Sequence, residues 1–171
     1  YGETGGEASA ERFEAMRGEL VDLVRAKVNG RRLVLWGHSL GGLVCSELAR
    51  TMPEVDGVII ETSARNAEET ARSWTPWYAA PFVRIVIARG LRGYDSVAAL
   101  KDFKGPVLVM GGETDETLPV QLSRSIGKGL REQDADVAYV EFAGRGHSDL
   151  ILHADFAPTL NAFFQRLKAA S

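Results

Sequence analysis

The sequence has a single cysteine, Cys45, so no disulfide can form within the chain. It has no apolar run close to the roughly 18 residues that a membrane-spanning helix needs. It also has no excess of basic residues, because 20 Lys and Arg stand against 23 Asp and Glu, for a formal net charge of -3. Nucleic-acid-binding domains usually carry a strongly basic surface, so this composition argues against a nucleic-acid partner.

The 171 residues are enough for one ordinary domain, and the apolar and charged fractions are those of a globular protein. Short apolar runs alternate along the chain with segments of helical periodicity. Strands are expected at 33–36, 55–62, 106–112 and 137–143, and helices at 10–28, 40–51, 119–132 and 157–169. The alternation predicts right-handed βαβ units, and so an α/β fold with a mostly parallel sheet and helices on both faces. The first run, LVLW at 33–36, has the pattern of a strand covered on both faces.

Residues 63–104 interrupt this alternation. We expect them to form a short cap, or lid, on a core made of residues 1–62 and 105–171. The segment contains the aromatic stretch WTPWY at 74–78 and then an apolar stretch with three arginines, Arg84, Arg89 and Arg92. We expect these arginines on the solvated face of a short lid helix, although they could instead meet an anionic lipid surface or an acidic group of the substrate.

Residues 37–41 read GHSLG, a GxSxG pattern between the first expected strand and the helix that follows it. A serine at such a tight turn is held in a strained conformation with its hydroxyl exposed, and small flanking glycines let the backbone pass close to its neighbours. The helix that begins there points free N–H groups at the same place. We therefore expect Ser39 to be a nucleophile and the N–H of Leu40 to bind an oxyanion. The alternative is a glycine-rich helix start with Ser39 as its N-cap.

A serine hydroxyl is a poor nucleophile unless a base removes its proton. The chain has three histidines. His147 is the best candidate because it follows the last expected strand, at the edge of the sheet where the serine also lies. His38 adjoins Ser39, so its side chain should diverge from the serine, and His153 lies in or just before the last helix.

The base must in turn be oriented by a third group, and an acid is expected after another strand. Asp115, in GGETDETLP, is our candidate, with Glu113 and Glu116 as alternatives. The cluster could also be a solvated acidic turn before a helix. It has neither EF-hand spacing nor a His-x-x-x-His pair nearby, so no metal is predicted, and this chemistry needs no cofactor.

The order Ser39, Asp115, His147, each after a successive strand, resembles the α/β-hydrolase superfamily. In that family the nucleophile follows the fifth strand, a variable cap the sixth, the acid the seventh and the histidine the eighth. The spacing from Gly112 to Asp115 to Pro119 is similar to the family's acid motif. The ending GHSDL at 146–150 is similar to small serine hydrolases that include membrane-associated depalmitoylating enzymes.

The same resemblance implies that the family's first four strands have no counterpart here, because YGETGG at 1–6 is similar to the loop after the fourth strand. We therefore expect this chain to be the C-terminal part of a longer hydrolase. The strand at 33–36 would otherwise be an exposed apolar edge, which the missing N-terminal half or a self-association partner would cover. A second oxyanion donor would be missing as well, and losing one such donor lowers turnover about 10²- to 10³-fold.

The resemblance implies a serine hydrolase that cleaves a small-molecule carboxylic ester or thioester through an acyl-enzyme. Substrate-binding residues are expected in the cap and beside the serine: Trp74, Trp77, Tyr78, Phe82 and His38. The four aromatic residues could equally serve to pack the cap on the core. A membrane surface is a further candidate partner. An amidase or perhydrolase could use the same triad, and a non-catalytic hydrolase-like scaffold or interaction module is the alternative from another class.

Overall fold

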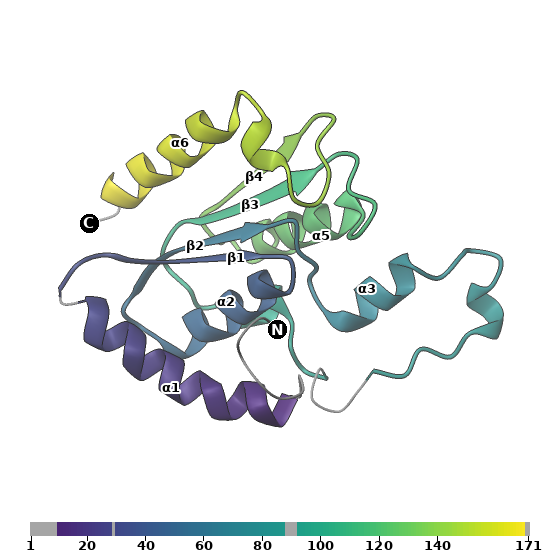
Figure 1. Ribbon diagram of the computed structural model, residues 1–171, viewed down its shortest axis with the longest axis horizontal. Helices are drawn as coiled ribbons and strands as arrows, with labels where there is room; N and C mark the ends of the chain where they lie inside the picture. The colour runs from purple at the N-terminus through teal and green to yellow at the C-terminus, as the bar shows by residue number, and fades with distance from the viewer. Residues whose placement is uncertain (1–9, 29, 88–91, 170–171) are drawn as a thin grey trace.

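The computed structural model describes residues 10–28, 30–87 and 92–169 (Figure 1). Its strands are β1 (Leu33–His38), β2 (Val55–Glu61), β3 (Val107–Gly112) and β4 (Val137–Phe142). Its α-helices are α1 (Ala10–Val28), α2 (Leu40–Thr51), α3 (Ala67–Ser73), α4 (Ser96–Ala99), α5 (Val120–Arg131) and α6 (Phe156–Ala169), and two 3₁₀ helices are η1 (Ala80–Phe82) and η3 (Leu150–Leu152). Every strand and helix expected from the alternation is present at nearly the expected bounds.

The four strands form one parallel sheet in the order β1-β2-β3-β4, so each strand pairs with the next one along the chain. This confirms the predicted parallel α/β fold. All four strands point the same way, and the residues that follow them therefore gather at one edge of the sheet.

Helices cover both faces of this sheet (Figure 1). Alternation along β2 sends Val58 and Ile60 to one face and Ile59 to the other, and all three are fully buried. On the first face, the core includes residues of α2, α4 and α5, with Val21 and Val24 of α1 packed against it. On the second face, Phe156 and Phe163 of α6 and Leu150 of η3 complete the core.

Strand β1 lies at one edge of the described sheet, and it is not covered on both faces as its apolar run predicts. Leu35 is buried on the α2 face, but Trp36, on the other face, is 45% exposed. Its ring lies 6.2 Å from that of Phe156 and its indole N–H donates to Glu61. Trp36 remains half exposed because the buried residues of α6 pack mainly on β2, β3 and β4.

The segment 63–104 leaves the sheet through α3 and extends away from the body of the molecule (Figure 1). Asn66 begins α3 by accepting a hydrogen bond from the N–H of Glu69. The segment then returns through α4, where Val97 is buried in the core together with Leu100, the residue after the helix. By packing, α4 therefore belongs with the core.

The lid helix expected around the arginines is not formed at residues 83–87, which have irregular backbone. Four of these five residues are β-branched, which lowers helix propensity. Arg84 is exposed, Arg92 donates to the carbonyl of Ile87, and Arg89 lies outside the described residues.

In the part of the chain that the structure covers, no helix is both long and apolar enough to cross a membrane.

Candidate active site

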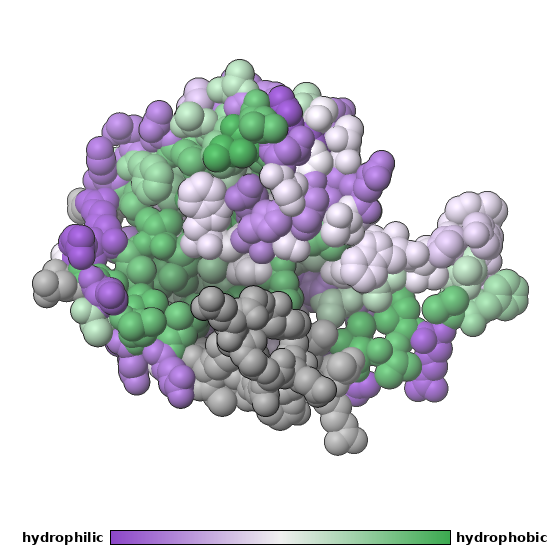
Figure 2. All heavy atoms as spheres, viewed as in Figure 1, coloured by the Kyte–Doolittle hydropathy of each residue, from purple (hydrophilic) through white to green (hydrophobic). Residues whose placement is uncertain are grey.

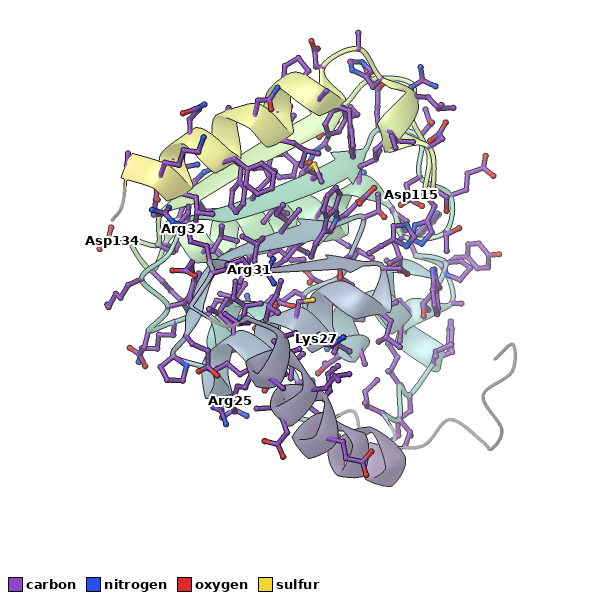
Figure 3. All side chains as sticks on the ribbon, turned by 60° about the vertical axis from the view of Figure 1, so that its left-hand side comes forward. Arg25, Lys27, Arg31, Arg32, Asp115 and Asp134 are labelled. Carbon is purple, nitrogen blue, oxygen red and sulfur yellow. The ribbon has the colours of Figure 1, made fainter. Side chains whose placement is uncertain are left out.

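The candidate residues lie at the edge of the sheet where the parallel strands end. Ser39 follows β1, Thr62 follows β2, and Asp115 and His147 lie in the loops after β3 and β4. Figure 3 shows Asp115 at this end, and Arg32 and Asp134, which precede β1 and β4, at the opposite end. The four loops and turns that follow the strands thus meet at one edge of the sheet.

Ser39 forms the turn between β1 and α2 in a conformation that favours glycine, with φ 55° and ψ -125°. Its main chain is fixed on both sides. The N–H donates to the carbonyl of Glu61 at 2.9 Å, and the carbonyl accepts from the hydroxyl of Ser63 at 2.7 Å and from the N–H of Gly42. Hydrogen bonds from the end of β2 and from the first turn of α2 therefore hold this strained conformation.

Close approach explains two of the glycines around Ser39, but not the third. A Cβ at Gly37 would lie 2.1 Å from the carbonyl oxygen of Gly41, and one at Gly42 would lie 2.6 Å from Oγ of Ser63. A Cβ at Gly41 would meet no described atom within 4 Å. The packing constraint therefore falls on Gly37 and Gly42, whereas the GxSxG pattern emphasises Gly37 and Gly41.

Asp115 and His147 are hydrogen-bonded to each other. Oδ2 of Asp115 lies 2.8 Å from Nδ1 of His147, and Oδ1 accepts the N–H groups of Thr117 and Leu118. The side chain of Asp115 is 1% exposed and that of His147 is 17% exposed. A carboxylate can only accept, so Nδ1 of His147 is the donor in this hydrogen bond.

The two alternative acids have other surroundings. Glu113 accepts the main-chain N–H of Gly144 at 2.8 Å, so it supports the loop that carries His147. Glu116 is exposed. The geometry therefore favours Asp115 as the partner of the imidazole.

His38 contacts the main chain of His147. Its Nε2 lies 2.7 Å from the carbonyl oxygen of His147, and the two ring centroids are 4.8 Å apart. The hydroxyl of Thr62 donates to the same carbonyl at 3.0 Å. Thr62 is not among the residues expected from the sequence, where its position after β2 is the one signal that points to it.

Within the described residues, no hydrogen bond joins the hydroxyl of Ser39 to the ring of His147. The two side chains share one edge of the sheet, and catalytic hydrogen bonds often become short only in the substrate complex.

No group of three or more His, Cys, Asp or Glu side chains among the residues that the structure describes could hold a metal ion.

A pocket of about 430 Å³ opens beside Ser39. Its described lining is uncharged and comes from α2, α3, the irregular stretch after η1 and the turn after Asp115: Ser39, Leu40, Leu43, Ser63, Ala64, Asn66, Ala67, Thr70, Ala71, Trp74, Val86, Ile87, Thr117 and Leu118. The N–H groups of Thr117 and Leu118 donate to Asp115, so Ser39 and the turn that follows Asp115 border the same pocket.

Of the aromatic residues expected to bind substrate, the structure brings only Trp74 to this pocket. Its indole N–H donates to the carbonyl of Thr117 at 2.9 Å. Trp77, Tyr78 and Phe82 are 86%, 65% and 89% exposed and do not line it, because the chain after α3 runs outward. Figure 2 shows this segment at the right of the view, with apolar surface outside the body of the molecule.

Comparisons with known proteins agree with this architecture. The sequence model of the prolyl oligopeptidase family matches residues 6–166. The lysophosphatidylserine lipase of Macaca fascicularis is 29% identical over 145 residues, which cover 75% of this chain and 35% of that protein. The chain thus spans about a third of the length of the curated relatives it matches first.

Two solved structures show the same fold. The acylaminoacyl peptidase of Pyrococcus horikoshii has a TM-score of 0.63 at 15% identity, covering 87% of this chain and 26% of that one. An α/β-hydrolase enzyme from the metagenome of lagoon sediments of Mar Chica, Morocco, has a TM-score of 0.64 at 21% identity, covering 96% and 74%.

Proposed function

This chain belongs to the prolyl oligopeptidase family and has the α/β-hydrolase fold, and on that premise we propose that it carries the catalytic triad of a serine hydrolase. The proposed reaction is cleavage of a carboxylic ester or thioester through an acyl-enzyme. Ser39 is the nucleophile, His147 the general base and acid, and Asp115 the residue that orients the imidazole.

The hydrogen bond between Asp115 and Nδ1 of His147 is the observation that carries this proposal. It fixes the tautomer in which Nε2 has a free lone pair, and a buried carboxylate stabilises the imidazolium that forms during the reaction. The strained backbone of Ser39 at the same edge supplies the second element of a nucleophile site.

In the proposed reaction, Oγ of Ser39 attacks the carbonyl carbon of the substrate while its proton passes to Nε2 of His147. The tetrahedral oxyanion accepts a hydrogen bond from the N–H of Leu40, in the first turn of α2. The C–O or C–S bond then breaks, and the departing alcohol or thiol takes the proton from His147. Water repeats the sequence on the acyl-enzyme, releasing the carboxylic acid and restoring the Ser39 hydroxyl.

The lining of the pocket beside Ser39 favours a substrate with an uncharged, largely apolar acyl group. Its described lining offers hydroxyl and amide groups at Ser63, Asn66, Thr70 and Thr117, but no charge to bind a free amine or a second carboxylate. The family is named for a peptidase, whereas the curated relative at 29% identity is named for hydrolysis of a lipid. The apolar lining of the pocket and the lipase relative favour ester over amide substrates.

A matched substrate panel tests the proposal. We expect the natural full-length protein to release p-nitrophenol from apolar acyl esters and to leave p-nitroanilides of the same acyl groups uncleaved, and a Ser39→Ala variant to cleave neither. Cleavage of the anilides that is lost in Ser39→Ala would make the protein an amidase. Turnover no greater than that of Ser39→Ala on any substrate would favour the non-catalytic scaffold.

A further inference from the structure

The carbonyl oxygen of His147 is held from two sides. Nε2 of His38 lies 2.7 Å away and Oγ1 of Thr62 lies 3.0 Å away. A carbonyl oxygen has two lone pairs and can only accept, so both hydrogen bonds can form at once and Nε2 of His38 must carry its proton. The two donors come from the ends of β1 and β2, whereas His147 lies in the loop after β4.

Thr62 keeps an unfavourable backbone conformation while it makes this contact. Its φ is 42°, in the left-handed region that a β-branched residue rarely adopts. The residue is completely buried, and its N–H donates to the carbonyl of Met110 at 2.8 Å. Strain of this kind persists only where the surroundings impose it, and it concentrates at functional sites.

His38 and Thr62 are also next in sequence to Ser39 and to Glu61, the residue that binds the N–H of Ser39. His38 precedes Ser39 directly, and Thr62 directly follows Glu61, whose carbonyl accepts the N–H of Ser39 at 2.9 Å. The main chain of Ser39 is therefore connected to the main chain of His147 through hydrogen bonds and two intervening peptide bonds.

We propose that His38 and Thr62 are positioning residues that hold the carbonyl of His147 and so place its imidazole relative to Ser39. The inference rests on the triad proposed above. Asp115 fixes the rotation of the ring through Nδ1, whereas the two donors fix the main chain from which the ring projects. Both anchors are needed because a displacement of about 1 Å at a reacting group can lower a rate about 10²-fold.

The loop has other supports that remain when these two donors are removed. Glu113 binds the N–H of Gly144, and Asp149 binds the N–H of Gly146 at 2.6 Å. The N–H of Thr114 donates to the carbonyl of Arg145. We therefore expect variants of His38 and Thr62 to fold, and their effects to stay local to His147.

Two matched pairs of variants test the proposal in the natural full-length protein. His38→Leu and Thr62→Val remove a donor with little change in bulk, whereas His38→Gln and Thr62→Ser keep an N–H or O–H. The readout is the second-order rate constant for phosphonylation of Ser39 by a fluorophosphonate probe. We expect His38→Leu and Thr62→Val to react about 10- to 100-fold more slowly, and His38→Gln and Thr62→Ser to recover most of the rate.

The double variant His38→Leu/Thr62→Val adds a further test. Both donors act on one oxygen atom, so we expect the combined loss to be smaller than the product of the two single losses. A rate close to that of the wild type in both His38→Leu and Thr62→Val would overturn the proposal. Equal losses in His38→Leu and His38→Gln would overturn it too, because they would show that the hydrogen bond is not what matters.

Hydrogen–deuterium exchange of residues 143–149 tests the same contacts without catalysis. We expect faster exchange in His38→Leu and Thr62→Val and near-normal exchange in His38→Gln and Thr62→Ser. Unchanged exchange in all four variants would contradict the positioning role. If the wild type is not phosphonylated at Ser39 but exchange follows this pattern, the hydrolase proposal fails while the two-sided support of His147 stands.

Discussion

Oδ2 of Asp115 lies 2.8 Å from Nδ1 of His147, and the other oxygen of the same carboxylate is bound by two main-chain N–H groups of its own turn. Both carboxylate oxygens therefore have hydrogen-bond partners. These bonds join Asp115, His147 and the turn that borders the pocket, and the proposed chemistry depends on this arrangement.

Replacing Asp115 by Asn tests this relationship. Asparagine has the same shape but no charge to stabilise an imidazolium, so we expect kcat to fall about 10³- to 10⁴-fold with a much smaller change in KM. Steady-state kinetics on the preferred ester measures it. Glu113→Gln is the matched control and should keep most of the activity. A larger loss in Glu113→Gln than in Asp115→Asn would move the acid to Glu113.

The glycines after Ser39 should differ in their tolerance of a methyl group. In Gly42→Ala the new Cβ would meet Ser63 and Ile60, and we expect the free energy of unfolding to fall by about 1–3 kcal/mol. Gly41→Ala places the methyl in open space on a helix, so we expect no loss and a gain of up to about 1 kcal/mol. Urea unfolding of both variants measures the difference, and equal losses would contradict the packing described here.

Two tryptophans of the same stretch should differ in their effect on substrate binding. Trp74 lines the pocket and donates to Thr117, so we expect Trp74→Ala to raise KM for apolar acyl esters several-fold. Trp77 is 86% exposed and lies outside the lining, so Trp77→Ala should leave KM unchanged. An increase in KM for Trp77→Ala that matches that of Trp74→Ala would show that the outward segment closes on the substrate.

Burial raises the pKa of the Cys45 thiol in α2 from 9.0 to about 11. The unfolded chain therefore loses this proton at lower pH than the folded chain, and the free energy of unfolding should fall as pH rises from about 9 to about 11, with no contribution below that range. Chemical denaturation of the wild type and of Cys45→Ala across this range isolates the effect, because other groups titrate equally in both. Parallel curves would contradict an effect of partial burial on this thiol.

The sequence was sufficient to predict the parallel sheet and the edge at which the candidate residues lie. Apolar runs and helical periodicity located the strands and helices, and the parallel arrangement then implied that residues after β1, β3 and β4 meet at one edge. The candidates Ser39, Asp115 and His147 follow from this arrangement, because each lies in a connection after a strand.

Long-range packing explains what the sequence could not predict. The positive φ of Thr62 depends on Met110 and His147, which are distant in sequence, so nothing local identifies it. The contact of His38 with His147 depends in the same way on the loop after β4. The direction of the chain after α3 determines which tryptophan reaches the pocket, and Trp36 is exposed because of where α6 packs.

The most direct test of the hydrolase proposal is mass spectrometry of the natural full-length protein after reaction with a fluorophosphonate. We predict one covalent adduct, on the peptide that contains Ser39, which disappears in Ser39→Ala and nearly disappears in His147→Ala. A folded protein with no adduct, or with an adduct on another residue that persists in Ser39→Ala, would contradict the account.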